Sequence, residues 1–173
     1  MVSCGDADGA VTGNTRRYGA SLEKIKKVIE PRSGEIMFGL NMIVNKGKTV
    51  FVGDTSVHEY PTSEQLAEIA ISSARVVRLF GFDPKVAFVS HSTFGQPLTS
   101  RTKHIKNAVD ILKDKDVDFK FDGDMQPDVA LNDEYKELYP FSEIVGNANI
   151  LIMPGQHSAA TVSYTHLRAH ETR

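Results

Sequence analysis

Hydrophobic positions along the chain follow the two-residue period of a strand in some segments and the period of a helix in others. Patterns typical of strands cover residues 35–44, 49–52, 86–90, 117–121 and 148–153. Helical spacing of apolar residues predicts helices over residues 21–29, 61–80, 100–113 and 133–138. Because a hairpin is followed by alternating helices and strands, this order predicts an α/β domain with αβα layers around a mixed sheet.

Local signals mark where several of these elements begin and end. Residues 45–48 contain Asn and Gly, which tolerate positive φ angles, so the first two strands are expected to form an antiparallel hairpin. The first of these strands is apolar on both faces, which favours a central place in the sheet. Thr62 and Gln65 have the spacing of a capping box, and Gly81 is the expected C-terminal stop of the same helix.

Composition narrows the class of protein. Of the 173 residues, 40% are hydrophobic and 24% are charged, and the net charge of −2 argues against general nucleic-acid binding. The single cysteine, Cys4, excludes an internal disulfide and fits a reducing compartment. No apolar run approaches the roughly 20 residues that span a bilayer, and the N-terminus lacks the features of a signal peptide. We therefore expect a cytoplasmic protein without a membrane or nucleic-acid partner.

The first candidate site is the polar loop that follows the strand 86–90. Ser90, Ser92, Thr93 and Gly95 offer hydroxyl and backbone N–H groups at the carboxyl end of that strand, just before a helix. Loops in this position bind anions and other ligands in open α/β sheets. The alternative is that the hydroxyls only satisfy local backbone groups or cap the helix. Because neighbouring side chains in an extended loop point apart, we assign no catalytic residue.

A second candidate loop carries carboxylates beyond the strand 117–121. Asp122, Asp124 and Gln126 are expected to share one rim with the first loop, where they would line a ligand site. Paired carboxylates also suit a divalent cation or a general base. The alternative is an Asp-Gly turn followed by a helix cap. Asp54, at the end of the hairpin, is either a third wall of the same site or a solvated strand end.

Other polar groups give weaker signals. Arg16 is a candidate clamp for a phosphate, or a solvated charge before the first helix. Residues 5–9 lack the remaining ligands of a calcium loop, and the chain has no Gly-x-Gly-x-x-Gly motif and no Walker sequence. His166 and His170 have metal-ligand spacing but fall in the final segment. We therefore expect no metal site and no self-contained nucleotide site.

The final segment, residues 162–173, departs from the pattern of the rest of the chain. A helix that covers the sheet should follow the apolar strand 148–153, yet Leu167 is the one large aliphatic side chain after Val162. We therefore interpret residues 162–173 as a non-native tail, and residues 1–161 as a partial domain.

A series of short motifs occurs in an order typical of one protein family. The motifs are Gly5-Asp-Ala-Asp8 with Thr15-Arg16, Asp54-Thr-Ser-Val-His58, Gln65-Leu-Ala-Glu-Ile-Ala70, Ser90-His-Ser-Thr-Phe-Gly95, Asp122-Gly-Asp-Met-Gln126, Asp128-Val-Ala-Leu131, Leu138-Tyr-Pro-Phe141 and Ala148-Asn-Ile-Leu-Ile-Met-Pro154. Together they resemble the phosphate acetyl/butyryl transferase family, in particular the transferase-like C-terminal region of large bacterial NADP-dependent malic enzymes. The resemblance covers about residues 2–160.

The resemblance implies an isocitrate-dehydrogenase-like fold, with two lobes and a cleft between them. True transferases of the family move an acetyl group between coenzyme A and phosphate. In the malic enzymes, the resemblance implies a region that senses acetyl-CoA and helps to hold a homo-oligomer together. Malate oxidation and decarboxylation, with NADP and a divalent metal, would belong to an N-terminal catalytic domain that this sequence lacks. The implied ligand is thus acetyl-CoA or a related acyl-CoA, with no cofactor in this chain and the missing catalytic domain as partner.

Two departures separate this chain from the true transferases. These carry a phosphate-binding arginine in the helix after the first loop, where our alignment places Glu23, and a carboxylate there repels phosphate. Thr15 and Arg16 instead match the malic-enzyme version of this segment. The Ser-Arg pair and the aspartate that transferases use lie beyond the last strand of this chain. We therefore favour a regulatory malic-enzyme fragment; the alternatives are a truncated phosphate acetyl- or butyryltransferase and a structural assembly domain with a vestigial cleft.

Overall fold

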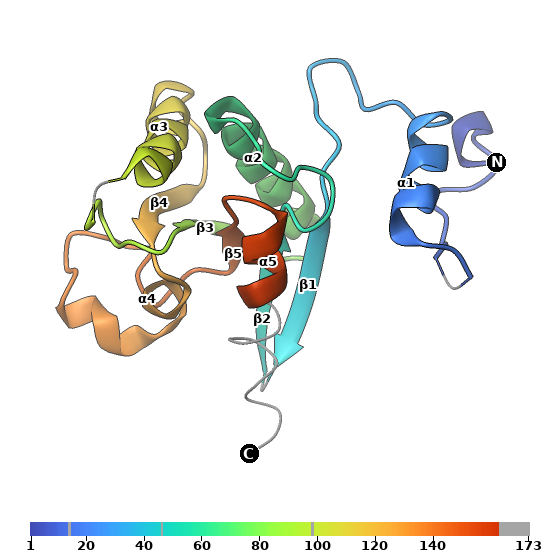
Figure 1. Ribbon diagram of the computed structural model, residues 1–173. Coiled ribbons are helices and arrows are strands. Elements are labelled where there is room, and N and C mark those ends of the chain that lie inside the picture. The colour runs from blue at the N-terminus through green and yellow to red at the C-terminus, as the bar shows by residue number, and fades with distance from the viewer. Residues whose placement is uncertain (14, 46, 98, 163–173) are drawn as a thin grey trace. The chain divides into compact units, whose positions relative to one another are not determined.

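A computed structural model describes residues 1–13, 15–45, 47–97 and 99–162 (Figure 1). The chain divides into two compact units, Met1–Glu35 and Ile36–Arg173. The smaller unit contains the 3-10 helix Val2–Cys4 and the helix α1, Tyr18–Lys26. α1 confirms the predicted N-terminal helix, although it begins and ends earlier than the predicted range 21–29.

The larger unit is built around a five-stranded sheet with the strand order β1-β2-β5-β3-β4. Its strands are β1 (Leu40–Asn45), β2 (Lys48–Gly53), β3 (Lys85–Val89), β4 (Lys120–Met125) and β5 (Ile150–Ile152). β1 and β2 form the predicted antiparallel hairpin, and every other pair of neighbours in this sheet is parallel. The predicted mixed sheet is therefore confirmed.

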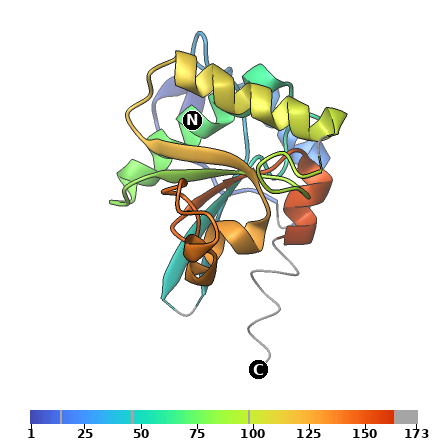
Figure 2. The same cartoon turned by 90° about the vertical axis from the view of Figure 1, so that its left-hand side faces the viewer.

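Helices cover both faces of this sheet (Figure 2). α2 (Ser63–Leu79) and α3 (Ser100–Asp114) pack on one face. The other face is covered by α4 (Pro127–Leu131), the 3-10 helix Asp133–Glu137 and α5 (Gln156–Val162). The larger unit therefore has the predicted αβα layers.

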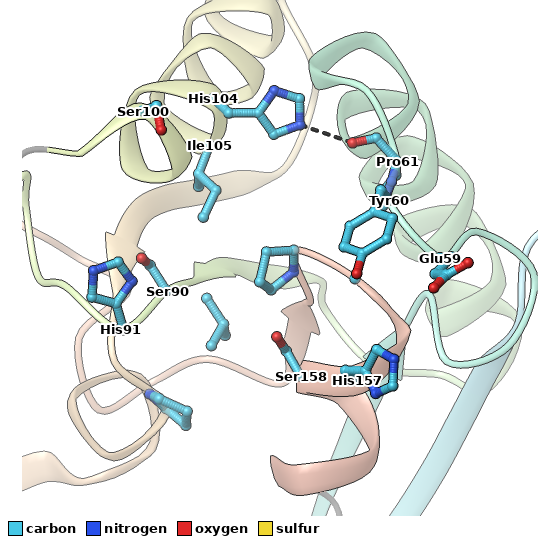
Figure 3. Close-up of a pocket in the computed structure, with 14 residues that line it drawn as sticks. Glu59, Tyr60, Pro61, Ser90, His91, Ser100, His104, Ile105, His157 and Ser158 are labelled. Atoms are coloured by element: carbon cyan, nitrogen blue, oxygen red, sulfur yellow. Dashed lines mark hydrogen bonds between the residues drawn. The ribbon is translucent and has the colours of Figure 1, made fainter.

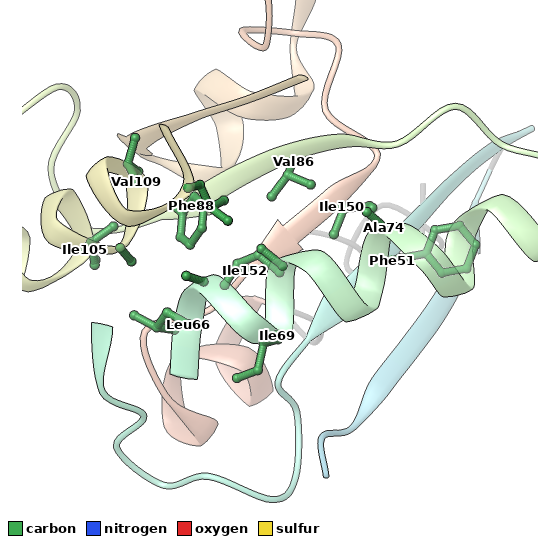
Figure 4. Packing of buried hydrophobic residues seen from close by; sticks show 14 of the residues in the cluster. Phe51, Leu66, Ile69, Ala74, Val86, Phe88, Ile105, Val109, Ile150 and Ile152 are labelled. Carbon is green, nitrogen blue, oxygen red and sulfur yellow. The ribbon is translucent and has the colours of Figure 1, made fainter. Parts of the chain in front are cut away.

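Alternation along the strands directs side chains into two hydrophobic clusters, one on each face of the sheet. From β3, Val86 and Phe88 enter the cluster below α2 and α3, whereas Ala87 and Val89 enter the opposite cluster. Figure 4 shows the first cluster, in which side chains of β2, β3 and β5 meet those of α2 and α3. Burial of both faces explains why these parallel strands have continuous apolar sequences.

The long helices begin at capping boxes. In α2 the predicted box is confirmed, because the Gln65 N–H donates to Thr62 Oγ1 at 3.2 Å and the Thr62 N–H donates to Gln65 Oε1 at 2.8 Å. α3 has a box of the same kind, formed by Thr99 and Thr102, which the sequence analysis did not identify. These caps fix the N-termini of both helices at the edge of the sheet where β3 ends.

The prediction that the first strand is central was wrong, because β1 forms an edge of the described sheet. Its apolar residues alternate between the two faces: Leu40 packs against one cluster and Ile43 against the other. Met42 and Val44, farther along the strand, are 51% and 59% exposed. An apolar sequence on both faces therefore indicates two covered faces at the start of β1, and it does not require a neighbouring strand on each side.

The prediction that the second candidate loop lies beyond a strand was also wrong. β4 begins later than predicted and contains Asp122, Gly123 and Asp124. A register shift between Phe88 and Val89 of β3 lets β4 continue through these polar residues. The strand persists because Asp124 finds hydrogen-bond partners inside the protein, as described below.

Two further segments differ from, or lie outside, the predicted elements. Residues 133–138 were predicted as a helix and contain the 3-10 helix Asp133–Glu137, and the short helix α4 was not predicted. The predicted tail lies outside the described residues apart from Val162, which ends α5, so its non-native origin stays a prediction. None of the helices in the described ranges has the length and apolar character needed to cross a bilayer.

Candidate ligand-binding site

A cavity of about 880 Å³ lies at the carboxyl ends of β3 and β5 (Figure 3). Its walls come from the loop after β2, the end of β3, the first turns of α3, the start of α4, the segment between β5 and α5, and the first turn of α5. The described residues that line it are Glu59, Tyr60, Pro61, Val89, Ser90, His91, Ser100, His104, Ile105, Pro127, Pro154, Gly155, His157 and Ser158. Ligands of open α/β sheets bind at this edge, so the cavity is the candidate site.

His104 joins the two long helices at one wall of the cavity. Its Nε2 lies 2.8 Å from the carbonyl oxygen of Pro61, which can only accept, so Nε2 carries a proton (Figure 3). Its Nδ1 lies 2.9 Å from Ser63 Oγ, and the Ser63 hydroxyl is also 2.9 Å from the carbonyl oxygen of His104. These bonds tie the start of α2 to α3 and keep the wall in place.

The loop after β3 is joined to the end of β4 by buried polar side chains. The Ser92 hydroxyl donates to Oδ2 of Asp124, and the Gly95 N–H donates to Oδ1 of the same carboxylate at 2.9 Å. Ser92 Oγ lies 3.2 Å from Ser90 Oγ, and the Ser92 N–H donates to Ser90 Oγ at 3.2 Å. Ser92 is fully buried and Asp124 is 3% exposed, whereas Ser90 lines the cavity.

Two further predicted residues join the same pair of loops nearer the surface. The Gln126 N–H donates to Thr93 Oγ1 at 3.3 Å, and Gln126 Nε2 donates to the carbonyl oxygen of His91 at 2.9 Å. The structure therefore brings together the predicted set Ser90, Ser92, Thr93, Gly95, Asp124 and Gln126. Of this set, Ser90 is the member that lines the cavity, and the others support it.

The loop after β3 is also held by an aromatic cluster, formed by Phe94, Tyr139 and Phe141. Phe94 has a φ of 49°, a left-handed conformation that is costly for a residue with a Cβ. Its ring centroid lies 5.3 Å from that of Tyr139 and 4.8 Å from that of Phe141. The Phe94 N–H also donates to the carbonyl oxygen of Asp124 at 2.6 Å. Ring contacts and this bond offset the local strain and fix the loop.

Asp54 follows the end of β2 and organises a different loop. Its Oδ1 accepts hydrogen bonds from the backbone N–H groups of Gly39, Ser56 and Val57 at 2.8, 2.9 and 3.2 Å. Its Oδ2 accepts from the His58 N–H at 2.8 Å and lies 2.7 Å from His58 Nδ1. Asp54 is 1% exposed and does not belong to the described lining of the cavity. It instead positions the loop that carries Glu59 and Tyr60 to the cavity.

Two predicted residues, Asp122 and Arg16, do not belong to this hydrogen-bonded group. Asp122 is half-buried in β4, and its Oδ1 accepts from the N–H of Gly123 at 2.8 Å, a local bond within the strand. Arg16 belongs to the Met1–Glu35 unit, whereas all the described lining residues belong to the larger unit. Ligand binding by Asp122 and Arg16 stays a prediction.

The family model for "Phosphate acetyl/butaryl transferase" matches residues 1–171 of this chain. The chain belongs to the phosphate acetyl/butaryl transferase family. It is 46% identical over 160 residues to the NADP-dependent malic enzyme of Rhizobium meliloti (strain 1021), covering 92% of this chain and 21% of that protein. It is also 33% identical over 156 residues to the phosphate acetyltransferase of Nitratidesulfovibrio vulgaris, covering 89% of this chain and 22% of that enzyme.

Solved structures of transferases share the fold of this family member. The structure of a phosphotransacetylase from Streptococcus pyogenes matches with a TM-score of 0.89 and 26% identity, covering 98% of this chain and 53% of that one. The chain thus spans about a fifth of the length of the curated malic enzyme and about half of the solved phosphotransacetylase. The resemblance stated from the sequence motifs is confirmed.

The cavity of this phosphate acetyl/butaryl transferase family member includes residues that sequence reasoning missed. Tyr60, His104 and His157 line it, but each stands in or beside a helix and belongs to no sequence motif with a recognisable spacing. The one usable signal was position, because Tyr60 and His157 follow shortly after strands that end at the same edge as β3.

The described lining of the cavity contains several side chains that form hydrogen bonds. Glu59 and three histidines, His91, His104 and His157, line the cavity, and the described lining contains no lysine or arginine. Within the described ranges, no group of three or more His, Cys, Asp or Glu is placed to hold a metal ion. The described lining therefore offers hydroxyl and imidazole groups for hydrogen bonds.

Proposed function

We propose that this chain is the transferase-like part of an NADP-dependent malic enzyme, and that it binds acetyl-CoA or a related acyl-CoA in the cavity at the end of β3. On this proposal it binds the ligand without transforming it. Malate oxidation and decarboxylation, which use NADP and a divalent metal, belong to a separate part of the same polypeptide. Binding in this part regulates that reaction and helps to hold a homo-oligomer together.

The cavity is the observation that carries this proposal. Its volume of about 880 Å³ falls in the range of small-molecule sites, roughly 300–1,000 Å³. The described lining combines apolar side chains such as Val89 and Ile105 with hydroxyl and imidazole groups, which suits the acyl group and the amide-bearing pantetheine arm of the ligand. The identity of 46% to a malic enzyme supports the choice of parent protein.

Calorimetry with acetyl-CoA tests the proposal on the 173-residue chain. We expect measurable binding that is at least about tenfold weaker in Ser100→Trp, because Ser100 lines the cavity and an indole there would fill it. Lys106→Trp is the matched control, since it places the same side chain at an exposed position of the same helix outside the described lining. Absence of heat at millimolar acetyl-CoA would favour a structural assembly domain instead.

The alternative is a phosphate acetyl- or butyryltransferase of which this chain is a part. The similarity to the phosphotransacetylase of Streptococcus pyogenes, with its TM-score of 0.89, favours this alternative. Glu23, at the position where we align the phosphate-binding arginine, argues against it because a carboxylate repels phosphate. Formation of acetyl phosphate from acetyl-CoA and phosphate by the chain would establish transferase activity and overturn our preference.

A further inference from the structure

The buried bond between Ser92 and Asp124 fixes the direction of a hydrogen-bond chain that ends at the cavity. A hydroxyl has one proton, and Ser92 donates it to Oδ2 of Asp124. Ser92 Oγ also lies 3.2 Å from Ser90 Oγ, and one of the two serines must donate in that contact. Because the Ser92 proton is already committed, the donor is Ser90.

The same reasoning determines which group Ser90 leaves for a ligand. Its proton points to Ser92 Oγ, and one of its two lone pairs accepts the Ser92 N–H at 3.2 Å. One lone pair of Ser90 Oγ remains without a partner among these contacts, and Ser90 lines the cavity beside His91 and Ile105 (Figure 3). A phosphate oxygen without a proton, which can only accept, finds no donor on Ser90, whereas an amide N–H finds an acceptor on it.

We infer that Ser90 is a hydrogen-bond acceptor that selects ligands carrying an N–H donor and disfavours the unprotonated oxygens of phosphate, with Ser92 and Asp124 as the residues that position its proton. This inference deepens the proposed function and rests on it, since it identifies an amide of the pantetheine arm as the group that contacts Ser90. It also assigns Asp124, buried and outside the described lining, a role in ligand preference.

Asp124→Asn is expected to reverse the donor-to-acceptor direction of the hydrogen bonds that link Asp124, Ser92 and Ser90. The Gly95 N–H donates to Oδ1 at 2.9 Å and therefore holds the carbonyl oxygen of the new amide on that side. The amide NH2 then faces Ser92 and donates to it, so Ser92 turns its proton toward Ser90. Ser90 in turn directs its own proton into the cavity. The variant should bind inorganic phosphate better and an amide-bearing ligand less well.

Calorimetry of the full 173-residue chain with three probes measures this reversal. We expect Asp124→Asn to lower the affinity for acetyl-CoA and for pantetheine about tenfold, the effect of one exchanged hydrogen bond. The same variant should raise the affinity for inorganic phosphate by a similar factor. Asp110→Asn is the matched control, because it removes the same charge from an exposed ion pair with Lys113 on α3. It should leave all three affinities unchanged.

A double variant distinguishes a change in the direction of the Ser90 hydrogen bond from the loss of the Asp124 charge. If Ser90 donates to phosphate in Asp124→Asn, adding Ser90→Ala removes the gain in phosphate affinity. A gain that survives Ser90→Ala is electrostatic and overturns the inference. Ser90→Ala alone should lower the affinity for pantetheine. Ser142→Ala is the control and should leave that affinity unchanged; Ser142 is also buried, and its hydroxyl accepts the Ile144 N–H at 3.4 Å. Equal loss in both would also overturn it.

The three probes keep this inference distinct from the proposed function. If the wild-type protein binds neither acetyl-CoA nor pantetheine, the proposed function is contradicted. The phosphate measurements then still decide in which direction the hydrogen bonds between Asp124, Ser92 and Ser90 run. Phosphate binding by wild type that is lost in Ser90→Ala would show that Ser90 donates, which overturns the inference while leaving acyl-CoA binding possible elsewhere in the cavity. Circular dichroism melts of each variant confirm that it is folded.

Discussion

Two buried aspartates, each beside the end of a strand, are held in different ways. Asp54 accepts four backbone N–H groups and lies 2.7 Å from Nδ1 of His58. Asp124 accepts one backbone N–H, from Gly95, and one side-chain hydroxyl, from Ser92. Both are almost completely buried, at 1% and 3% exposure. Burial is therefore the same, and the kind of donor differs.

The donors decide what each carboxylate can do. A backbone N–H always donates, so the four backbone donors around Asp54 have one arrangement and require two acceptor oxygens. A hydroxyl both donates and accepts, so the pair of Ser92 and Asp124 has a second arrangement available when the chemistry of its partner changes. Asp54 is thus suited to fixing a loop, and Asp124 to setting the polarity of a site.

The largest expected effect that tests this comparison is the loss of stability in Asp54→Asn. The amide NH2 would face N–H donors on one side of the carboxylate and leave them without an acceptor, which should cost about 3 kcal/mol. Asp124→Asn should cost only about 1 kcal/mol, because the Ser92 hydroxyl can rotate to accept from the amide. Urea unfolding of the two variants, with Asp110→Asn as the exposed control, gives both values. Equal costs would contradict the distinction between the two sites.

Much of the fold was predictable because its signals are local. The runs around Val86 and Ile150 are apolar at successive positions, as expected for strands buried on both faces, and the capping box at Thr62 marks the start of α2. The place of β1 at the edge was not predictable, because it depends on which strands pair with β2 on its other side. The sequence of one strand carries no information about its neighbours' order.

The candidate site was predictable only in part. Position near the ends of strands identified the segments of Ser92 and Asp124 as neighbours, because parallel strands end at one edge, although Asp124 lies within β4 and not beyond it. The direction of the hydrogen bonds between these segments depends on side-chain distances of a few ångströms. So does the place of His104, on α3, in the wall of the cavity. Hydroxyl groups, which donate or accept equally well, give no sign of their direction in a sequence.

A glycine beside each aspartate sharpens the comparison with a smaller effect. Each donates its N–H to the carboxylate, Gly39 to Asp54 and Gly95 to Asp124. A Cβ at Gly39 would overlap Ser56 Oγ and lie 3.1 Å from Oδ1 of Asp54, which its backbone donors hold in place. A Cβ at Gly95 would meet nothing within 4 Å, but the φ of 80° is strained for any residue other than glycine.

We therefore expect Gly39→Ala to cost about 1 to 3 kcal/mol through crowding, and Gly95→Ala about 1 kcal/mol through backbone strain. Thermal melts of the two variants measure these losses. Adding Ser56→Ala to Gly39→Ala removes the overlapping hydroxyl and should recover part of the loss. A Gly95→Ala variant less stable than Gly39→Ala would indicate that the loop of Asp124 is the more rigid of the two.

The smallest expected effect concerns a carboxylate that is exposed rather than buried. Glu143 lies 2.5 Å from Lys120 at the start of β4, and both side chains are more than half exposed. The hydrogen bond and charge of Lys120 lower the pKa of Glu143 below its ordinary value of 4.5, and the same pair raises the pKa of Lys120 above 10.5. Because solvent screens such a pair, its contribution to stability should be small.

The pH dependence of this small contribution distinguishes it from the buried sites. The contribution of Glu143 is present above its ordinary pKa and is lost as the pH falls through the lowered pKa. That of Lys120 is present below its ordinary pKa and is lost as the pH rises through the raised one. Glu143→Gln should therefore lower the urea midpoint slightly near pH 7 and leave it unchanged at the two extremes, and added salt should shrink the difference at pH 7. If the difference in urea midpoint persists in acid and at high salt, the pair of Glu143 and Lys120 behaves like the buried aspartates. Solvent exposure would then not explain why the two kinds of site differ.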